Sequence, residues 1–220
     1  MTYDELIAKR DAEFFKAFAK DKNINRAEFN KKNPVKMPTG TNGFQNVPRD
    51  FEITPPTTEL EKIYFVLSEY CKKFPDVKTP NIVLSGATGT GKTFMSQIIA
   101  NNLMDRKIWV EYTTAFALIK EFQNYANSFW RDDAKINDFL SCDLLLIDDL
   151  GSEPIVKNLT HEHIYNTINE RLSNGRPFII TTNLAPQALI EKYDQRIASR
   201  ILSKQSSIVI PVNGKDLRLS

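Results

Sequence analysis

The sequence has few cysteines and no long apolar run, and each absence excludes a class of protein. Only Cys71 and Cys142 occur among the 220 residues, and they form no CxxC pair, which argues against a disulfide framework or a zinc module. No stretch approaches the roughly 18 consecutive apolar residues of a membrane helix. The N-terminus carries acids early and has no apolar core followed by a cleavage site, so no secretory signal is expected. We therefore expect a cytoplasmic protein with no membrane partner.

The chain also lacks a strong excess of either charge. Its 29 Lys/Arg and 27 Asp/Glu give a net charge of +2, too small to indicate nucleic acid by itself. Residues 1–50 carry ten basic and seven acidic side chains, which is a mild bias and not a polybasic arm. With 41% hydrophobic and 25% charged residues, wholesale disorder is excluded. Composition therefore indicates one ordinary folded domain and names no function.

The first 43 residues are predicted to form an extension separate from the main domain, which we place at 44–220. Thr2 and Glu5 have the spacing of a capping box and predict a helix to about residue 21. Its apolar stripe contains three phenylalanines, Phe14, Phe15 and Phe18. Five prolines and two glycines between residues 33 and 56 indicate a linker.

Strands and helices alternate through the rest of the chain. Strands are predicted at residues 81–86, 108–112, 142–148, 178–182 and 207–211. Helices are predicted at residues 58–74, 92–104, 114–127, 134–140, 160–172, 187–192 and 194–203. This alternation predicts an α/β fold with a parallel sheet covered by helices on both faces. The continuous apolar run at 142–148 is typical of a strand buried on both faces.

One motif carries chemistry. The run Gly86, Ala87, Thr88, Gly89, Thr90, Gly91, Lys92 and Thr93 fits G-x-x-x-x-G-K-[ST] in full, between a predicted strand and a predicted helix. The glycines let consecutive backbone N–H groups face a polyphosphate at the positive end of the helix. Lys92 adds a cation for the β- and γ-phosphates, and the Thr93 hydroxyl is a ligand for Mg²⁺. The motif predicts a site for a nucleoside triphosphate with Mg²⁺.

Two carboxylates follow the apolar strand at 142–148. We assign Asp148 as the carboxylate that holds Mg²⁺ and Asp149 as the carboxylate that polarises the attacking water. Because adjacent side chains of a strand point to opposite faces, the two acids need not act together.

Other branches of the phosphate-loop proteins lack their signatures here. No NKxD guanine-reading motif follows the loop, residues 172–175 only partly match the signature of ABC transporters, and no Arg-rich lid occurs between residues 104 and 175. What remains is the additional-strand type of phosphate-loop protein, in which we expect the carboxylates at the end of a strand that neighbours the loop strand. The predicted strand at 178–182 ends at Asn183, whose amide could orient a water near Asp149.

The chain resembles the AAA+ ATPases, specifically the DnaC/DnaI-type replicative helicase loaders and the related IstB transposition ATPases. The resemblance covers residues 44–220 and rests on GATGTGKT, LLLIDDLGSE (144–153), IITTNL (179–184) and QRIASRI (195–201). It implies a P-loop NTPase of AAA+ type, a three-layer α/β/α sandwich with a five-stranded parallel sheet. Only nine residues follow Pro211, so we expect no C-terminal helical lid, which also resembles the loader clade.

The resemblance also implies roles for particular residues. Asn183 corresponds to the sensor-1 residue, and Arg200 to an arginine finger presented to ATP on the adjacent subunit, with Arg196 as the competing choice. Arg218 is a candidate sensor-2 arginine. The segment that opens such domains lines the adenine pocket, and here it contains Phe44, Asn46 and Val47.

Two regions are candidates for contact with partners. In the loaders, the extra helix between the second and third strands faces single-stranded DNA, and the corresponding segment here is 113–141. Its candidate DNA-binding residues are Phe129, Trp130, Arg131, Lys120 and Lys135. The apolar stripe of the N-terminal extension is the candidate docking arm for the replicative hexameric helicase. Its alternative is to fold back on its own core.

Three hypotheses for function follow. The first is an ATP-dependent loader of the replicative DNA helicase onto single-stranded DNA, with self-association through the ATP site and an ATPase activity that is weak alone. The second is an IstB-like transposition helper that acts on double-stranded DNA. The third is a metabolic kinase, which predicts phosphate transfer to a small acceptor.

Overall fold

One parallel five-stranded sheet lies between two layers of helices. The computed structural model describes residues 48, 50–51, 58–77, 81–127, 133–156 and 159–214. The sheet order is β2-β3-β4-β1-β5 and every ladder is parallel. Its strands are β1 (Asn81–Ser85), β2 (Val110–Thr114), β3 (Leu144–Leu150), β4 (Phe178–Thr182) and β5 (Ser207–Pro211). Strand β4 therefore separates the phosphate-loop strand β1 from the carboxylate strand β3, so the carboxylates do not follow the strand directly beside β1.

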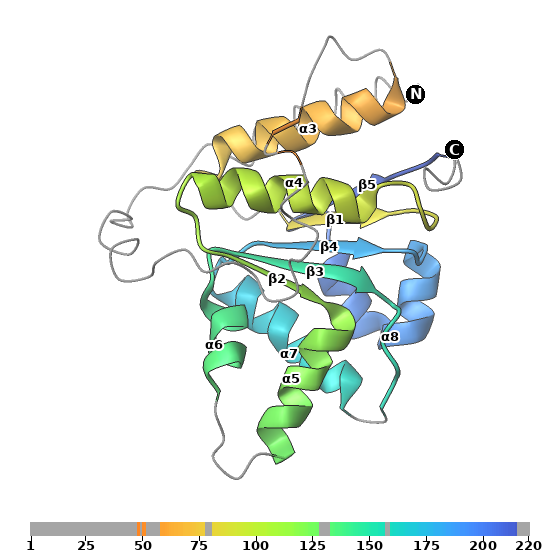
Figure 1. Cartoon of the computed structure of the whole chain (residues 1–220). Coiled ribbons are helices and arrows are strands. Elements are labelled where there is room, and N and C mark those ends of the chain that lie inside the picture. The colour runs from red at the N-terminus through yellow and green to blue at the C-terminus, as the bar shows by residue number, and fades with distance from the viewer. Residues whose placement is uncertain are drawn as a thin grey trace.

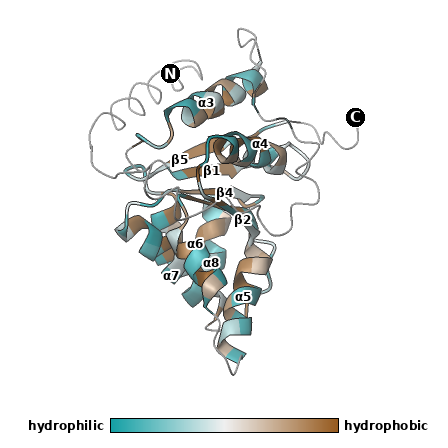
Figure 2. Cartoon of the chain, turned by 60° about the vertical axis from the view of Figure 1, so that its left-hand side comes forward, coloured by the Kyte–Doolittle hydropathy of each residue, from teal (hydrophilic) through white to brown (hydrophobic). Residues whose placement is uncertain are grey.

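The helices divide between the two faces of the sheet (Figure 1). One layer holds α3 (Glu59–Lys73) and α4 (Lys92–Asp105). The other holds α5 (Ala115–Asn127), α6 (Ala134–Ser141), α7 (Thr160–Ser173) and α8 (Pro186–Ile201). The helices carry both hydrophobic and hydrophilic segments (Figure 2), as expected for elements that cover a sheet. The predicted three-layer α/β/α architecture is confirmed.

Alternation along β3 distributes its side chains between two cores. Leu144 and Leu146 join the cluster that contains residues of α3 and α4, whereas Leu145 and Ile147 join the cluster on the opposite face. All four side chains are at most 1% exposed. The strand is apolar at every position because both of its faces are covered. Continuing the alternation places Asp148 on the α4 face of the sheet.

Some element boundaries differ from the predicted ones for identifiable local reasons. Strand β2 begins at Val110, two residues later than predicted, where the Trp109 N–H donates to Asp143 Oδ2 at 3.0 Å. The two helices predicted at 187–192 and 194–203 correspond to the two parts of α8, which are separated by a kink at Asp194, whose φ is 68°. The predicted capping box of α3 is confirmed, with reciprocal hydrogen bonds between Thr58 and Glu61.

Within the described residues, none of the helices combines the length and the apolar character needed to cross a membrane. Cys71 and Cys142 are both buried and free.

Candidate nucleotide-binding site

The phosphate loop joins β1 to α4 as predicted, and its glycines occupy positions that are unfavourable for other residues. Gly91 is the N-cap of α4 with φ 93°, a left-handed conformation that favours glycine. A Cβ on Gly86 would lie 2.1 Å from the carbonyl oxygen of Val212, which follows β5. No side chain caps α4 and its first turn holds no acid. The loop and the positive end of α4 therefore suit an anion such as a polyphosphate.

Lys92 lies against the same loop. Its side chain is buried at 6% exposure, and Nζ donates to the carbonyl oxygens of Gly86 at 2.8 Å and Ala87 at 2.7 Å. The cation is thus held at the loop, where the motif analysis placed it. Of the other loop residues, Thr90 is buried and its hydroxyl donates to the Ala87 carbonyl at 2.9 Å. Gly89 has φ 78°, and Thr88 follows Ala87 in the turn between β1 and α4.

Three hydroxyl groups converge on the Asp148 carboxylate. Thr93 Oγ1, from the start of α4, lies 3.0 Å from Oδ1 and 3.1 Å from Oδ2. Tyr112 of β2 donates to Oδ2 at 2.8 Å, and Thr181 of β4 donates to Oδ1 at 2.6 Å. Burial and then the charge of Asp148 raise the pKa of Tyr112 far above its ordinary value, so its hydroxyl stays a neutral donor.

The pair formed by Thr93 and Asp148 fits a magnesium ion bound with a triphosphate. Mg²⁺ prefers hard oxygen ligands and is usually held by one or two protein oxygens together with phosphates. The hydroxyl and the carboxylate contact each other directly and lie beside the anion-binding loop. These two residues are therefore the ones that would hold the ion.

Asp149 faces a different partner because the strand is distorted at this point. The pairing of β3 with β4 shifts register between Ile147 and Leu150, and Asp149 has φ 56°. Its N–H donates to the Thr181 hydroxyl at 2.8 Å instead of to a ladder carbonyl. Its carboxylate accepts from Asn183 Nδ2 at 2.9 Å. The structure thus brings together the two residues that sequence reasoning assigned to the attacking water.

The loop after β3 is tied to α8 by a buried carboxylate that sequence reasoning did not single out. Glu153 is 1% exposed and accepts from the Gly151 N–H at 2.9 Å and from the Tyr193 hydroxyl. Lys192 Nζ donates to the carbonyl oxygens of Gly151 at 2.6 Å and Glu153 at 3.2 Å. This cluster joins the loop that follows Asp149 to the end of α8 that precedes the kink at Asp194.

The two candidate finger arginines lie beyond that kink and differ in their contacts. Arg196 has a side chain 75% exposed and forms an ion pair with Asp194 at 3.3 Å. Arg200 is half-buried and donates to Asn169 Oδ1 at 3.0 Å and to the Tyr165 hydroxyl at 2.9 Å, both on α7. Neither Tyr165 nor Asn169 was predicted, although their spacing of four residues places them on one face of a helix.

The structure describes only two of the residues predicted to contact DNA. Lys120 is exposed on α5. Lys135 on α6 pairs with the buried Glu111 at 2.6 Å, with Nζ also 5.1 Å from the Phe139 ring centroid, which gives it a structural partner. The remaining predicted site residues lie outside the described residues: Phe129, Trp130, Arg131, Phe14, Phe15, Phe18, Phe44, Asn46, Val47 and Arg218.

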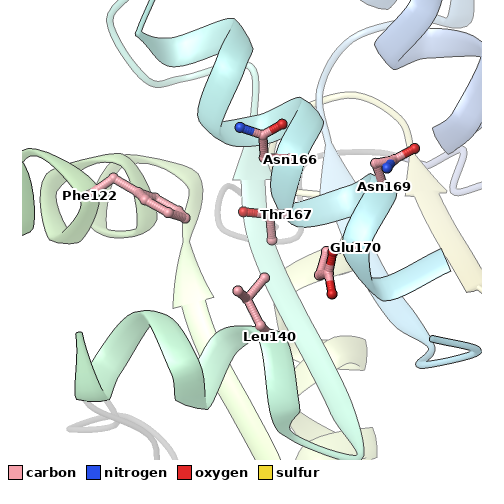
Figure 3. A pocket seen from close by; sticks show the side chains of 6 residues that line it. All are labelled: Phe122, Leu140, Asn166, Thr167, Asn169 and Glu170. Atoms are coloured by element: carbon pink, nitrogen blue, oxygen red, sulfur yellow. The ribbon is translucent and has the colours of Figure 1, made fainter. Parts of the chain in front are cut away.

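A separate pocket of about 200 Å³ lies on the face of the sheet opposite α4. Figure 3 shows its lining residues, which come from α5, α6 and α7: Phe122, Leu140, Asn166, Thr167, Asn169 and Glu170. Among the described residues, the buried Thr167 hydroxyl has no hydrogen-bond partner. Phe122 stacks on His163 with ring centroids 4.3 Å apart, so it packs within the helical layer. The pocket shares Asn169 with the Arg200 contacts and none of its residues with the phosphate loop.

We expect Tyr112→Phe to weaken the use of Mg²⁺ without disturbing the fold. It removes one of the three hydroxyls that orient Asp148, and loss of such a supporting contact typically costs about 10–100-fold in metal affinity or activity. The measurement is the Mg²⁺ concentration for half-maximal ATP turnover. Tyr70→Phe is the matched control, because within the described part of the chain the Tyr70 hydroxyl has no partner. An unchanged magnesium dependence in Tyr112→Phe contradicts the assignment of Asp148.

The fold and this site define a P-loop ATPase of the AAA+ type. The strand order, the phosphate loop after β1, the carboxylates at the end of β3 and the polar end of β4, which lies between these two strands, all agree with that class. The chain belongs to the family of IstB-like ATP binding proteins, whose pattern matches residues 72–220. The resemblance predicted from the sequence motifs is thereby confirmed.

Individual relatives are associated with replication and with a phage-like element. The chain is 28% identical to the phage-like element PBSX protein XkdC of Bacillus subtilis over 153 residues, which are 68% of this chain and 56% of XkdC. It is 27% identical to the replicative helicase loader DnaI of the same organism over 127 residues, 56% of this chain and 40% of DnaI. The chain thus spans about half the length of the curated relatives it matches.

Solved structures of replication proteins share the fold. The DnaC helicase loader superposes with a TM-score of 0.67 at 18% identity, covering 77% of this chain and 98% of that one. A replication initiator DnaA bound to AMPPCP and single-stranded DNA superposes with a TM-score of 0.61 at 21% identity, covering 82% and 52%.

Proposed function

We propose that this protein is an ATP-dependent loader of the replicative DNA helicase onto single-stranded DNA. The observation that carries the proposal is a phosphate loop beside the contacts Thr93–Asp148 and Asn183–Asp149, on a chain whose relatives include a helicase loader. The fold shared with the DnaC helicase loader also supports it. In this proposal, ATP binding changes the contacts that this chain makes with neighbouring molecules.

In this proposal each site residue has one task. The loop amides and Lys92 bind the phosphates, and Thr93 with Asp148 holds Mg²⁺, which neutralises charge on the β- and γ-phosphates. Asp149, oriented by Asn183, polarises the attacking water. Arg200 is presented to the ATP of an adjacent copy. Hydrolysis is weak in the isolated chain because that arginine comes from a neighbour.

The N-terminal extension supplies the grip on the helicase in this proposal, through its predicted apolar stripe. We expect the triple variant Phe14→Ala, Phe15→Ala, Phe18→Ala to bind a purified helicase hexamer at least about tenfold more weakly, since the loss of a single buried hot-spot side chain costs about 2 kcal/mol or more. The measurement is the dissociation constant, and the ATPase rate should stay within about twofold because the extension precedes the predicted ATPase domain. Phe29→Ala, a loss of one aromatic elsewhere in the extension, is the control. Equal helicase affinity in the triple variant and the wild type removes the docking arm from the proposal.

An IstB-like transposition helper acting on double-stranded DNA is the second candidate, because the matching family is IstB-like. The two functions differ in the partner of the same ATPase domain. A purified helicase hexamer that forms a complex with the full chain and gains access to single-stranded DNA favours the loader. ATP-driven filaments on duplex DNA without helicase binding favour the transposition helper.

A further inference from the structure

Arg200 is held by three acceptors in a fixed direction. Its Nε donates to Asn169 Oδ1 at 3.0 Å, one Nη donates to the Tyr165 hydroxyl at 2.9 Å, and the other donates to the Arg196 carbonyl at 3.1 Å. The guanidinium carbon also lies 4.5 Å from the centroid of the Tyr165 ring. Contacts from both α7 and α8 therefore restrict a side chain that would otherwise sample many rotamers.

All three acceptors are neutral, which keeps the full positive charge of the guanidinium available. Arg196 differs, because its charge is paired with Asp194 at 3.3 Å. No described carboxylate pairs with Arg200. An anion that approaches this surface thus meets an uncompensated cation at Arg200.

The guanidinium of Arg200 retains N–H donors that can bind such an anion. Arginine has five N–H donors, and three of those of Arg200 are engaged, leaving two. Because the planar group is already oriented by Tyr165 and Asn169, a phosphate need not supply the energy of ordering the side chain.

We propose that Tyr165 and Asn169 are positioning residues that orient Arg200 toward the triphosphate of an adjacent copy. This inference rests on the proposed role of Arg200 in trans. Tyr165 supplies a hydroxyl acceptor and an aromatic face, and Asn169 supplies a neutral oxygen. Both residues act through Arg200, which serves the ATP of an adjacent copy. They therefore affect the rate of hydrolysis and not the affinity of a subunit for its own ATP.

The test measures kcat and KM for ATP in the full chain at a protein concentration that gives wild-type assembly. Tyr165→Phe and Asn169→Ala should each lower kcat about 10-fold, since a hydrogen bond to a charged group is lost, while KM for ATP stays within twofold. Asn169→Asp places a carboxylate beside Arg200 and should lower kcat further, although it keeps the shape of the side chain. Asn166→Ala is the matched control, since Asn166 is an exposed residue of the same helix without a contact to Arg200.

Combination with Arg200→Ala separates positioning from a general structural effect. If Tyr165 and Asn169 act through Arg200, adding either change to Arg200→Ala lowers kcat no further. Equal losses in the wild-type and Arg200→Ala backgrounds overturn the inference, and so does an unchanged kcat in both single variants. Full activity of Arg200→Ala itself overturns the proposed role of Arg200, and this inference falls with it. A second readout is the Arg200 Nε–H resonance, which should lose its protection from solvent exchange in Asn169→Ala.

Discussion

Replacement of Lys92 by alanine is expected to abolish productive use of ATP. Its ammonium lies against the phosphate loop through the carbonyl oxygens of Gly86 and Ala87. Removal of one preorganised donor to a reacting centre typically costs about 10²–10³ in turnover, and the lost charge also weakens binding of the triphosphate. Calorimetry with Mg²⁺ and ATP, together with steady-state hydrolysis, measures both effects.

Folding and charge need separate controls in this experiment. Lys72→Ala removes one positive charge from a side chain 62% exposed on α3 and should leave both measurements unchanged. The thermal transition of Lys92→Ala shows whether the variant still folds cooperatively. ATP affinity and hydrolysis at wild-type levels in a folded Lys92→Ala variant would refute the nucleotide site and everything proposed from it.

The sequence pattern predicts which face of the sheet carries Asp148, the candidate metal ligand. It predicts the local geometry of the site less well. Alternation along β3 places Asp148 on the same face as Leu144 and Leu146, which is the face covered by α4. The same rule applied to β2 and β4 finds Tyr112 and Thr181 on that face, and the hydrogen bonds to Asp148 confirm both. The alternation of side chains along the strands therefore indicates both of these hydrogen-bond donors to Asp148, although neither Tyr112 nor Thr181 belongs to a motif.

The conformation of Asp149 could not be predicted from the same pattern. Strict alternation would turn this carboxylate to the opposite face of the sheet. Instead its positive φ and the register shift of β3 against β4 bring it to Asn183. The cause is a side chain of another strand, because the Thr181 hydroxyl replaces a backbone acceptor for the Asp149 N–H. Such a contact spans 32 residues of sequence and leaves no local signal.

The connection between the loop after β3 and α8 also depends on tertiary packing. Glu153 reads as a loop acid in the sequence, yet it is buried against Tyr193 and Lys192, forty residues further along the chain. Burial and then the charge of Glu153 raise the pKa of Tyr193, so the tyrosine remains a neutral donor to that carboxylate. This contact links the strand that carries Asp149 to the helix that carries Arg200.

Arg200→Ala is expected to reduce hydrolysis by about 10³-fold or more in the assembled protein, the scale of an arginine finger. Binding of ATP by the isolated chain should change little, because the residue contacts Tyr165 and Asn169 on α7 and no residue of its own phosphate loop. Calorimetry on dilute protein and hydrolysis at assembling concentrations distinguish the two effects. Equal loss of binding and hydrolysis would place Arg200 in its own site or in a structural role.

Mixing two inactive variants tests directly whether the arginine acts on a neighbour. Arg200→Ala subunits keep an intact ATP site, and Lys92→Ala subunits keep an intact Arg200. In an equimolar mixture with head-to-tail contacts, about a quarter of the interfaces pair the intact ATP site of an Arg200→Ala subunit with the intact Arg200 of a Lys92→Ala subunit. Hydrolysis should therefore recover to about a quarter of the wild-type rate. A mixture that stays as inactive as its components contradicts action in trans, because a residue acting within its own subunit cannot be replaced by one on a partner.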